Sequence, residues 1–136
     1  MIHTTHTIRV RYAETDPMKY VYYGNYATYF EVGRVELFRE LGMPYEEIER
    51  LGFWLPVSQF SIKYLKPALY DQNLEIHTFI KKTPGVRIEF EYEIYNDSKE
   101  KITEAKTTLF FLDSKKNKIV KCPDFLMDLI QKNWKE

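Results

Sequence analysis

The sequence has few of the residues that build disulfides and metal sites. Among its 136 residues there are one cysteine, Cys122, and three histidines, His3, His6 and His77. A single thiol cannot form a disulfide within the chain, so a reducing cytoplasm is the expected compartment. Three histidines separated in this way along the sequence do not predict a metal site.

Net charge, long apolar runs and several catalytic motifs are also absent. Lysine plus arginine and aspartate plus glutamate both number 20, so bulk charge does not favour binding to nucleic acid or anionic membranes. Residues 1–7 lack the apolar core of a signal peptide, and no run is long enough to span a bilayer. There is no glycine-rich phosphate loop, no Cys-His pair and no Gly-x-Ser-x-Gly elbow. We therefore expect no nucleic-acid partner and no transmembrane segment.

The residues that are abundant favour a folded domain rich in β-structure. Hydrophobic residues make up 44% of the chain and aromatic residues 16%, with eleven tyrosines and nine phenylalanines. A chain of this length fits one domain, residues 1–136, and can bury a substantial core. Aromatic residues favour strands and aromatic-lined pockets.

Alternation of apolar and polar residues predicts most of the strands. It is clearest at 86–95, where Val86, Ile88 and Phe90 alternate with charged residues after the turn 83–85. The same pattern predicts strands at 6–12, 59–64 and 74–80. A further strand is predicted at 102–113, whose end, Leu109–Leu112, is apolar on both faces, and a short run follows at 119–121.

Helical spacing predicts one long helix after a loop at 13–21. Its apolar face is formed by Tyr26, Tyr29, Phe30, Gly33, Leu37 and Leu41. Gly33 is costly in the middle of a helix, which indicates close approach of another backbone. Gly42 can end this helix in a left-handed cap, and Pro44 suits the first turn of a shorter second helix. A terminal helix is predicted after Asp124.

The order of these elements predicts an α+β fold. Consecutive strands joined by short turns pair as neighbours, so an antiparallel sheet should wrap the long helix. A single layer of this kind leaves strand edges and one sheet face partly uncovered, and oligomerisation is the usual remedy. We therefore expect a homo-oligomer.

The main candidate for chemistry is Asp16, which precedes the long helix. A helix start offers unpaired N–H groups and partial positive charge. The N–H of Tyr23, with that of Gly24, could stabilise the oxyanion of acyl transfer while Asp16 attacks the substrate or activates water. The alternative is that Asp16 only caps the helix or forms a turn before Pro17, because Asp-Pro is common in loops.

Carboxylates on the long helix are weaker candidates. Glu31 and Glu36 lie close to Arg34 in the sequence, and this spacing predicts salt bridges on an exposed helix surface. Glu31 would become a candidate catalytic carboxylate only if it faced a pocket.

Several segments between Arg11 and Ile76 resemble a known family. They are Arg11–Asp16, Val21–Tyr26 and Tyr29–Glu36, followed by Tyr64–Ala68 and Asp71–Ile76. On these residues the chain resembles the 4-hydroxybenzoyl-CoA thioesterase family, and within it the YbgC-type acyl-CoA thioesterase branch. The resemblance runs from the first predicted strand into the last long one.

The resemblance implies a hotdog fold, in which an antiparallel sheet wraps a long central helix. It implies hydrolysis of thioesters of coenzyme A, or of acyl carrier protein, with Asp16 as the catalytic aspartate and the Tyr23 backbone amide polarising the carbonyl. Tyr22 falls where an aromatic residue borders the acyl group, and Gly24 and Asn25 complete the substrate-binding turn. It also implies a dimer or a homotetramer with sites at subunit interfaces. No metal or prosthetic group is expected, coenzyme A being part of the substrate.

The phosphates of coenzyme A would need cations, and the turn at 82–87 is the candidate. Lys82, Thr83 and Arg87 flank this turn, which in such folds lies near a subunit boundary. The competing interpretation is a solvated hairpin end, the usual explanation of a local charge cluster.

Two residues depart from the family pattern. Tyr23 replaces a histidine that is common in the YbgC-type branch, but its backbone amide is retained. Lys19 stands where the family often has glycine, and a positive φ there would strain a lysine. This difference motivates an alternative function, a non-hydrolytic acyl-binding module of the same fold. A hotdog dehydratase or hydratase would need a histidine near the helix, and a pure interaction protein would have no cavity near Asp16.

Overall fold

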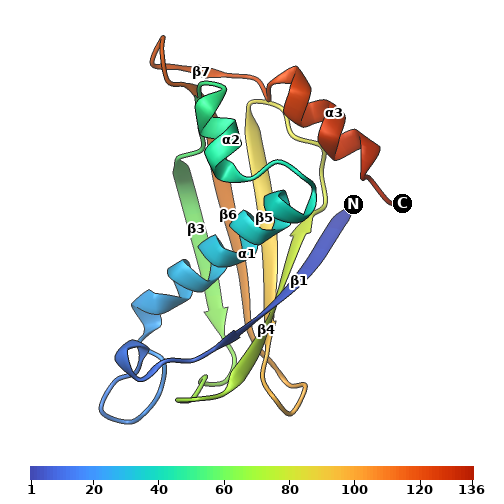
Figure 1. Cartoon of the computed structure of the whole chain (residues 1–136). Coiled ribbons are helices and arrows are strands. Elements are labelled where there is room, and N and C mark those ends of the chain that lie inside the picture. The colour runs from blue at the N-terminus through green and yellow to red at the C-terminus, as the bar shows by residue number, and fades with distance from the viewer.

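The computed structural model describes residues 1–136 as a curled antiparallel sheet crossed by one long helix (Figure 1). The strands are β1 Ile2–Arg9, β2 Phe53–Trp54, β3 Val57–Tyr64, β4 Asn73–Ile80, β5 Arg87–Tyr95, β6 Lys101–Asp113 and β7 Lys118–Val120. The helices are α1 Tyr26–Glu40, α2 Tyr45–Arg50 and α3 Asp124–Lys132, and 3-10 turns lie at Tyr12–Glu14 and Tyr23–Asn25. The predicted α+β fold, with a sheet wrapped around a long helix, is confirmed.

The sheet follows the order β1-β4-β5-β6, and β3 lies on the far side of β6. Consecutive pairing was predicted for all four long strands after the helices. It is confirmed for β4, β5 and β6 but wrong for β3, which pairs with β6 instead of β4. The connection 65–72 is long enough to cross the end of the sheet. On its way the Ala68 carbonyl accepts the Val21 N–H, and the Gln72 carbonyl accepts the Val10 N–H. The connection therefore supports the loop that contains Asp16.

α1 packs on the sheet through a fully buried face that includes Phe30, Leu37 and Phe38. A Cβ atom on Gly33 would lie 2.4 Å from Thr78 Oγ1 and 3.1 Å from Ile76 Cγ2. A neighbouring strand does lie close to Gly33, but the predicted approach of another backbone is wrong, because the nearest atoms belong to side chains of β4.

The ends of the elements follow the sequence signals with two differences. Gly42 has a φ of +93° after α1, and α2 begins directly after Pro44, as predicted. The first strand covers Ile2–Arg9 instead of 6–12, because half-buried threonine and histidine side chains continue the alternation toward the N-terminus. The two-residue strand β2 was too short to predict.

None of the helices combines the length and apolar character needed to cross a membrane.

The salt bridge predicted for Arg34 is wrong. Arg34 is buried, with 7% of its surface exposed, and its Nη1 donates to the Tyr92 hydroxyl at 3.0 Å. Its position on α1 faces β5, so the sheet covers it. Glu36 pairs with Arg39 at 3.3 Å, while Glu31 is exposed.

Candidate active site

The loop before α1 holds one carboxylate oxygen of Asp16 and leaves the other without a partner. An antiparallel bridge between Thr15 and Val21 closes the loop, and the Asp16 N–H donates to the Tyr20 carbonyl at 2.8 Å. Asp16 Oδ1 accepts the Met18 N–H at 2.9 Å and the Tyr20 N–H at 3.2 Å. No hydrogen bond reaches Oδ2 from any part of the chain. Asp16 therefore forms a turn, as the structural alternative held, and still has one oxygen available.

Lys19 adopts the left-handed conformation, with a φ of 68°. Its N–H donates to the Asp16 carbonyl at 2.9 Å, and its carbonyl accepts the Tyr70 N–H at 3.0 Å. Its ammonium lies 4.5 Å from the centre of the Tyr12 ring and 3.4 Å from the Tyr12 hydroxyl. These contacts hold a conformation that costs a non-glycine residue roughly 1–2 kcal/mol.

The start of the helical segment presents two backbone donors. Residues 23–25 form a 3-10 turn that continues into α1. The Asn25 N–H donates to the Tyr22 carbonyl, whereas the N–H groups of Tyr23 and Gly24 find no acceptor within the chain. A Cβ atom on Gly24 would lie 2.9 Å from the Tyr22 ring, so glycine leaves room for that ring. Unpaired N–H groups at such a position attract negative charge.

Asp16, Tyr22 and Tyr23 line one open pocket of about 500 Å³. The complete lining is Asp16, Tyr20, Val21, Tyr22, Tyr23, Tyr26, Tyr64, Leu65, Lys66 and Pro67. The structure therefore brings the proposed carboxylate, the aromatic residue and the helix start together. Gly24 and Asn25 are not part of this lining, and neither is Glu31.

Glu14 is a residue of the site region that the sequence analysis missed. Its carboxylate accepts the Arg11 N–H at 2.8 Å and the Tyr29 hydroxyl at 2.9 Å. Its carbonyl accepts the Asn25 side-chain amide at 2.8 Å, so Asn25 supports the loop. Burial raises the pKa of Glu14, but these hydrogen bonds and the Arg11 guanidinium outweigh it and hold the pKa below its ordinary value. The spacing Arg11-x-x-Glu14, typical of a capping box, was the available signal.

The turn residues Lys82, Thr83 and Arg87 gather around a second pocket of about 690 Å³. Lys82 pairs with Glu89 at 3.4 Å, and the Arg87 guanidinium lies 5.2 Å from the centre of the Phe110 ring. This pocket and the Asp16 pocket have no lining residue in common.

The strand register separates the two pockets within one chain. Tyr64, in the Asp16 pocket, is opposite Thr103 on β6, whereas Arg87 is opposite Phe110 on the same strand. Seven residues of a strand span about 23 Å. Figure 1 likewise shows the loop before α1 and the connection from β4 to β5 at opposite ends of the sheet.

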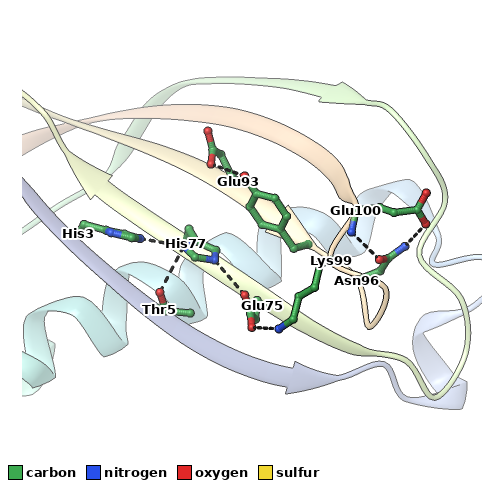
Figure 2. A network of polar contacts seen from close by, with 9 residues as sticks. His3, Thr5, Glu75, His77, Glu93, Asn96, Lys99 and Glu100 are labelled. Carbon is green, nitrogen blue, oxygen red and sulfur yellow. Dashed lines mark hydrogen bonds and ion pairs between the residues drawn. The ribbon is translucent and has the colours of Figure 1, made fainter.

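Two of the three histidines lie side by side, although they are distant in the sequence. Figure 2 shows His3 of β1 beside His77 of β4, with His3 Nε2 and His77 Nδ1 2.8 Å apart. The other ring nitrogen of His77 lies 3.1 Å from Glu75, which pairs with Lys99 at 2.8 Å. Nowhere in the chain do three or more metal-binding side chains converge.

Comparison with known proteins identifies the family. Residues 10–130 match the model of the thioesterase-like superfamily. The "Putative acyl-CoA thioesterase YneP" of Bacillus subtilis is 39% identical over 106 residues, 78% of this chain and 77% of that protein. The acyl-CoA thioester hydrolase YbgC of Escherichia coli O6:H1 is 30% identical over 113 residues, 82% and 83% of the two chains.

A solved structure gives the same result. The DHNA-CoA thioesterase of Staphylococcus aureus superposes with a TM-score of 0.89 at 33% identity, covering 97% of this chain and 91% of that one. The hotdog fold implied by the sequence resemblance is confirmed. The match over residues 10–130 and the superposition both identify the same family as the helix wrapped by a sheet. The chain therefore belongs to the thioesterase-like superfamily of thioester hydrolases.

Proposed function

We propose that this protein hydrolyses acyl-CoA thioesters in the pocket between Asp16 and the start of α1. One observation carries the proposal: an unpartnered carboxylate oxygen and the unpaired N–H group of Tyr23 belong to residues that line the same cavity. The acyl-CoA activity named for YneP and YbgC supports the choice of substrate. The reaction needs no resident cofactor in this proposal, and coenzyme A enters as part of the substrate.

The backbone donors supply the electrostatic part of the mechanism. The thioester carbonyl oxygen accepts hydrogen bonds from the N–H groups of Tyr23 and Gly24, where the helix dipole also favours negative charge. The hydrogen bonds from these donors become stronger as the carbonyl oxygen becomes an oxyanion. They therefore stabilise the transition state more than the bound substrate, and this lowers the barrier to hydrolysis.

Asp16 supplies the reacting oxygen or the base. As a nucleophile, Oδ2 attacks the carbonyl carbon, the thiolate of coenzyme A leaves, and water hydrolyses the resulting mixed anhydride. As a general base, Asp16 takes a proton from water, which attacks directly, and the departing thiolate is protonated. A mixed anhydride on Asp16, detected by mass spectrometry with a slow substrate, would support the first route, and its absence under single-turnover conditions would support the second.

A second subunit is part of the proposal. β3 pairs only with β6, and apolar side chains along its free edge are exposed, including Val57 at 50%, Phe60 at 43% and Tyr64 at 46%. A long apolar edge strand invites pairing with another chain. We infer that two copies pair through β3 in antiparallel orientation about a twofold axis, as a dimer or as half of a tetramer.

This pairing accounts for the position of the basic turn. In an antiparallel β3 pair, the Val57 end of one strand lies beside the Tyr64 end of the other. Lys82 and Arg87 of the partner subunit then approach the Asp16 end of the first subunit, where they can bind coenzyme A phosphates. Replacing Lys82 by alanine should weaken affinity for acyl-CoA, and salt should weaken it further.

The test is hydrolysis of a thioester panel by wild type, Asp16→Asn and Asp113→Asn. The panel includes short, long, branched and aryl acyl groups on coenzyme A and on acyl carrier protein. Asp113 is a matched control, because its Oδ1 also accepts two backbone N–H groups, from Lys115 and Lys116 at 3.0 Å. We expect Asp16→Asn to lose at least about a hundredfold in kcat while Asp113→Asn stays near wild type.

The other outcomes of this panel contradict the proposal. Full activity in folded Asp16→Asn would show that Asp16 is not catalytic. Tight binding of acyl-CoA by wild type without turnover would identify the non-hydrolytic binding module instead.

A further inference from the structure

Glu14 lies two residues before Asp16, at the end of the first 3-10 turn. Its side chain is only 15% exposed, and both carboxylate oxygens are engaged. Oε1 accepts the Arg11 N–H at 2.8 Å and the Tyr29 hydroxyl at 2.9 Å, and Oε2 accepts the Arg11 Nε–H at 3.1 Å. Because both oxygens of Glu14 already accept hydrogen bonds, this carboxylate is not available as a catalytic base.

The backbone carbonyl of Glu14 makes two further contacts. It accepts the Tyr22 N–H at 2.9 Å and the Asn25 side-chain amide at 2.8 Å. Tyr22 directly precedes the unpaired N–H groups, and Asn25 follows them. The two contacts therefore bracket the peptide units that would bind the oxyanion.

Tyr29 connects the same residue to the body of the helix. It lies in the first turn of α1 and is 2% exposed, so its hydroxyl has a fixed position. Hydrogen bonds to an ionised acceptor are stronger than neutral ones. Glu14 thus joins the loop of Asp16, the peptide units after Tyr22 and the first turn of α1.

We propose that Glu14, together with Tyr29 and Asn25, is a positioning residue that fixes the Asp16 loop against the start of α1. The inference rests on the proposed function, because it concerns the geometry between Asp16 and the two backbone donors. Catalysis by oriented groups is sensitive to displacement, and about 1 Å of misplacement can cost a hundredfold in rate. Glu14 itself does not touch the substrate.

An ordinary surface ion pair would behave differently. Arg11 and Glu14 have the same spacing as Glu36 and Arg39, which pair on the exposed side of α1 at 3.3 Å. Glu36 has no contact with the loop before α1, so Glu36→Ala is the matched control. Exposed pairs of this kind contribute at most about 1 kcal/mol to stability.

The experiment measures kcat and KM for Glu14→Ala, Glu14→Gln, Tyr29→Phe and the double variant Glu14→Ala/Tyr29→Phe. We expect kcat to fall about a hundredfold in Glu14→Ala and about tenfold in Tyr29→Phe, with KM changed less than about threefold. Glu14→Gln keeps one acceptor oxygen, so its kcat should lie between wild type and Glu14→Ala. The double variant should resemble Glu14→Ala, because both changes break the same contact.

Hydrogen exchange of the free protein provides a readout that does not depend on turnover. The hydrogen-bonded amides within residues 16–25 should exchange faster in Glu14→Ala and Tyr29→Phe, while β4 and β5 exchange as in wild type and Glu36→Ala shows no change. Unchanged exchange at 16–25, or unchanged kcat in folded Glu14→Ala, would overturn the role of Glu14. The variant Asp16→Asn, assayed in parallel, separates this result from failure of the proposed function. If Asp16→Asn stays active or wild type never hydrolyses a thioester, the catalytic role of Glu14 falls as well, whatever the exchange shows.

Discussion

Lys19 is one of the two residues at which we expected a departure from the family pattern, and its backbone lies in the left-handed region. Its φ of 68° is sterically free for glycine but costly for a residue that carries a Cβ atom. Glycine would relieve roughly 1–2 kcal/mol of strain and lose roughly 0.5–1 kcal/mol to the entropy of the unfolded chain. We predict that Lys19→Gly changes the free energy of unfolding by less than about 1 kcal/mol and keeps kcat/KM within about threefold.

Lys19→Val should instead lower both stability and kcat/KM, because the turn beside Asp16 would open. Lys99 offers a control, since it has a φ of 64° in the turn between β5 and β6 and does not line the pocket. Lys99→Val should lose similar stability, measured by urea denaturation, and retain activity. Equal activity in both valine variants would show that the conformation of Lys19 does not position Asp16.

At the scale of the element, the two histidines connect β1 to the sheet. His3 stacks on the Phe79 ring at 4.3 Å and shares a hydrogen bond with His77. Burial, and next the neighbouring His77, lower the pKa of His3, while Glu93 raises it less. The folded state therefore binds fewer protons than the unfolded state below the ordinary histidine pKa of about 6.5.

The sign of the effect on stability follows from this. The contribution of neutral His3 is fully present above about pH 6.5 and is lost as the pH falls through the lowered pKa of the folded state. We predict that wild type loses more stability between pH 7.5 and pH 5 than His3→Gln, as measured by urea denaturation. His6→Gln is the control, since His6 lies on the same strand without a side-chain hydrogen bond, and it should follow wild type. Identical slopes for wild type and His3→Gln would contradict the prediction.

The elements also show which features a single sequence can predict. Strands β4 and β5 were predictable because each buries alternate residues on one face. The position of Asp16 near the start of α1 was predictable because the two are close in the sequence. Alternation does not encode which edge a strand joins, so the position of β3 was not predicted. The burial of Arg34 and the pairing of His3 with His77 depend on contacts between segments that are distant in the sequence. Neither feature could be predicted from a local sequence pattern.

At the scale of the whole molecule, the proposed pairing of two subunits through the free edge of β3 would complete the active site with residues of the partner. Charge on this edge should separate the subunits, so Val57→Asp should reduce the mass measured by light scattering to that of the 16.4 kDa monomer. Thr7→Asp places the same charge on the other edge strand, β1, and should leave the oligomer intact. An oligomer that survives Val57→Asp in a folded protein would place the interface elsewhere.

A composite site makes a sharper prediction about mixed oligomers. A hybrid of one Asp16→Asn subunit and one Lys82→Ala/Arg87→Ala subunit contains one doubly defective site. Its other site combines native Asp16 with native Lys82 and Arg87 of the partner subunit. Random reassociation of equal amounts makes about half of the dimers hybrid, so the mixture should recover about a quarter of wild-type kcat/KM although each variant alone is impaired. If Lys82 and Arg87 served the pocket of their own chain, no hybrid would contain an intact site, and mixing would recover nothing.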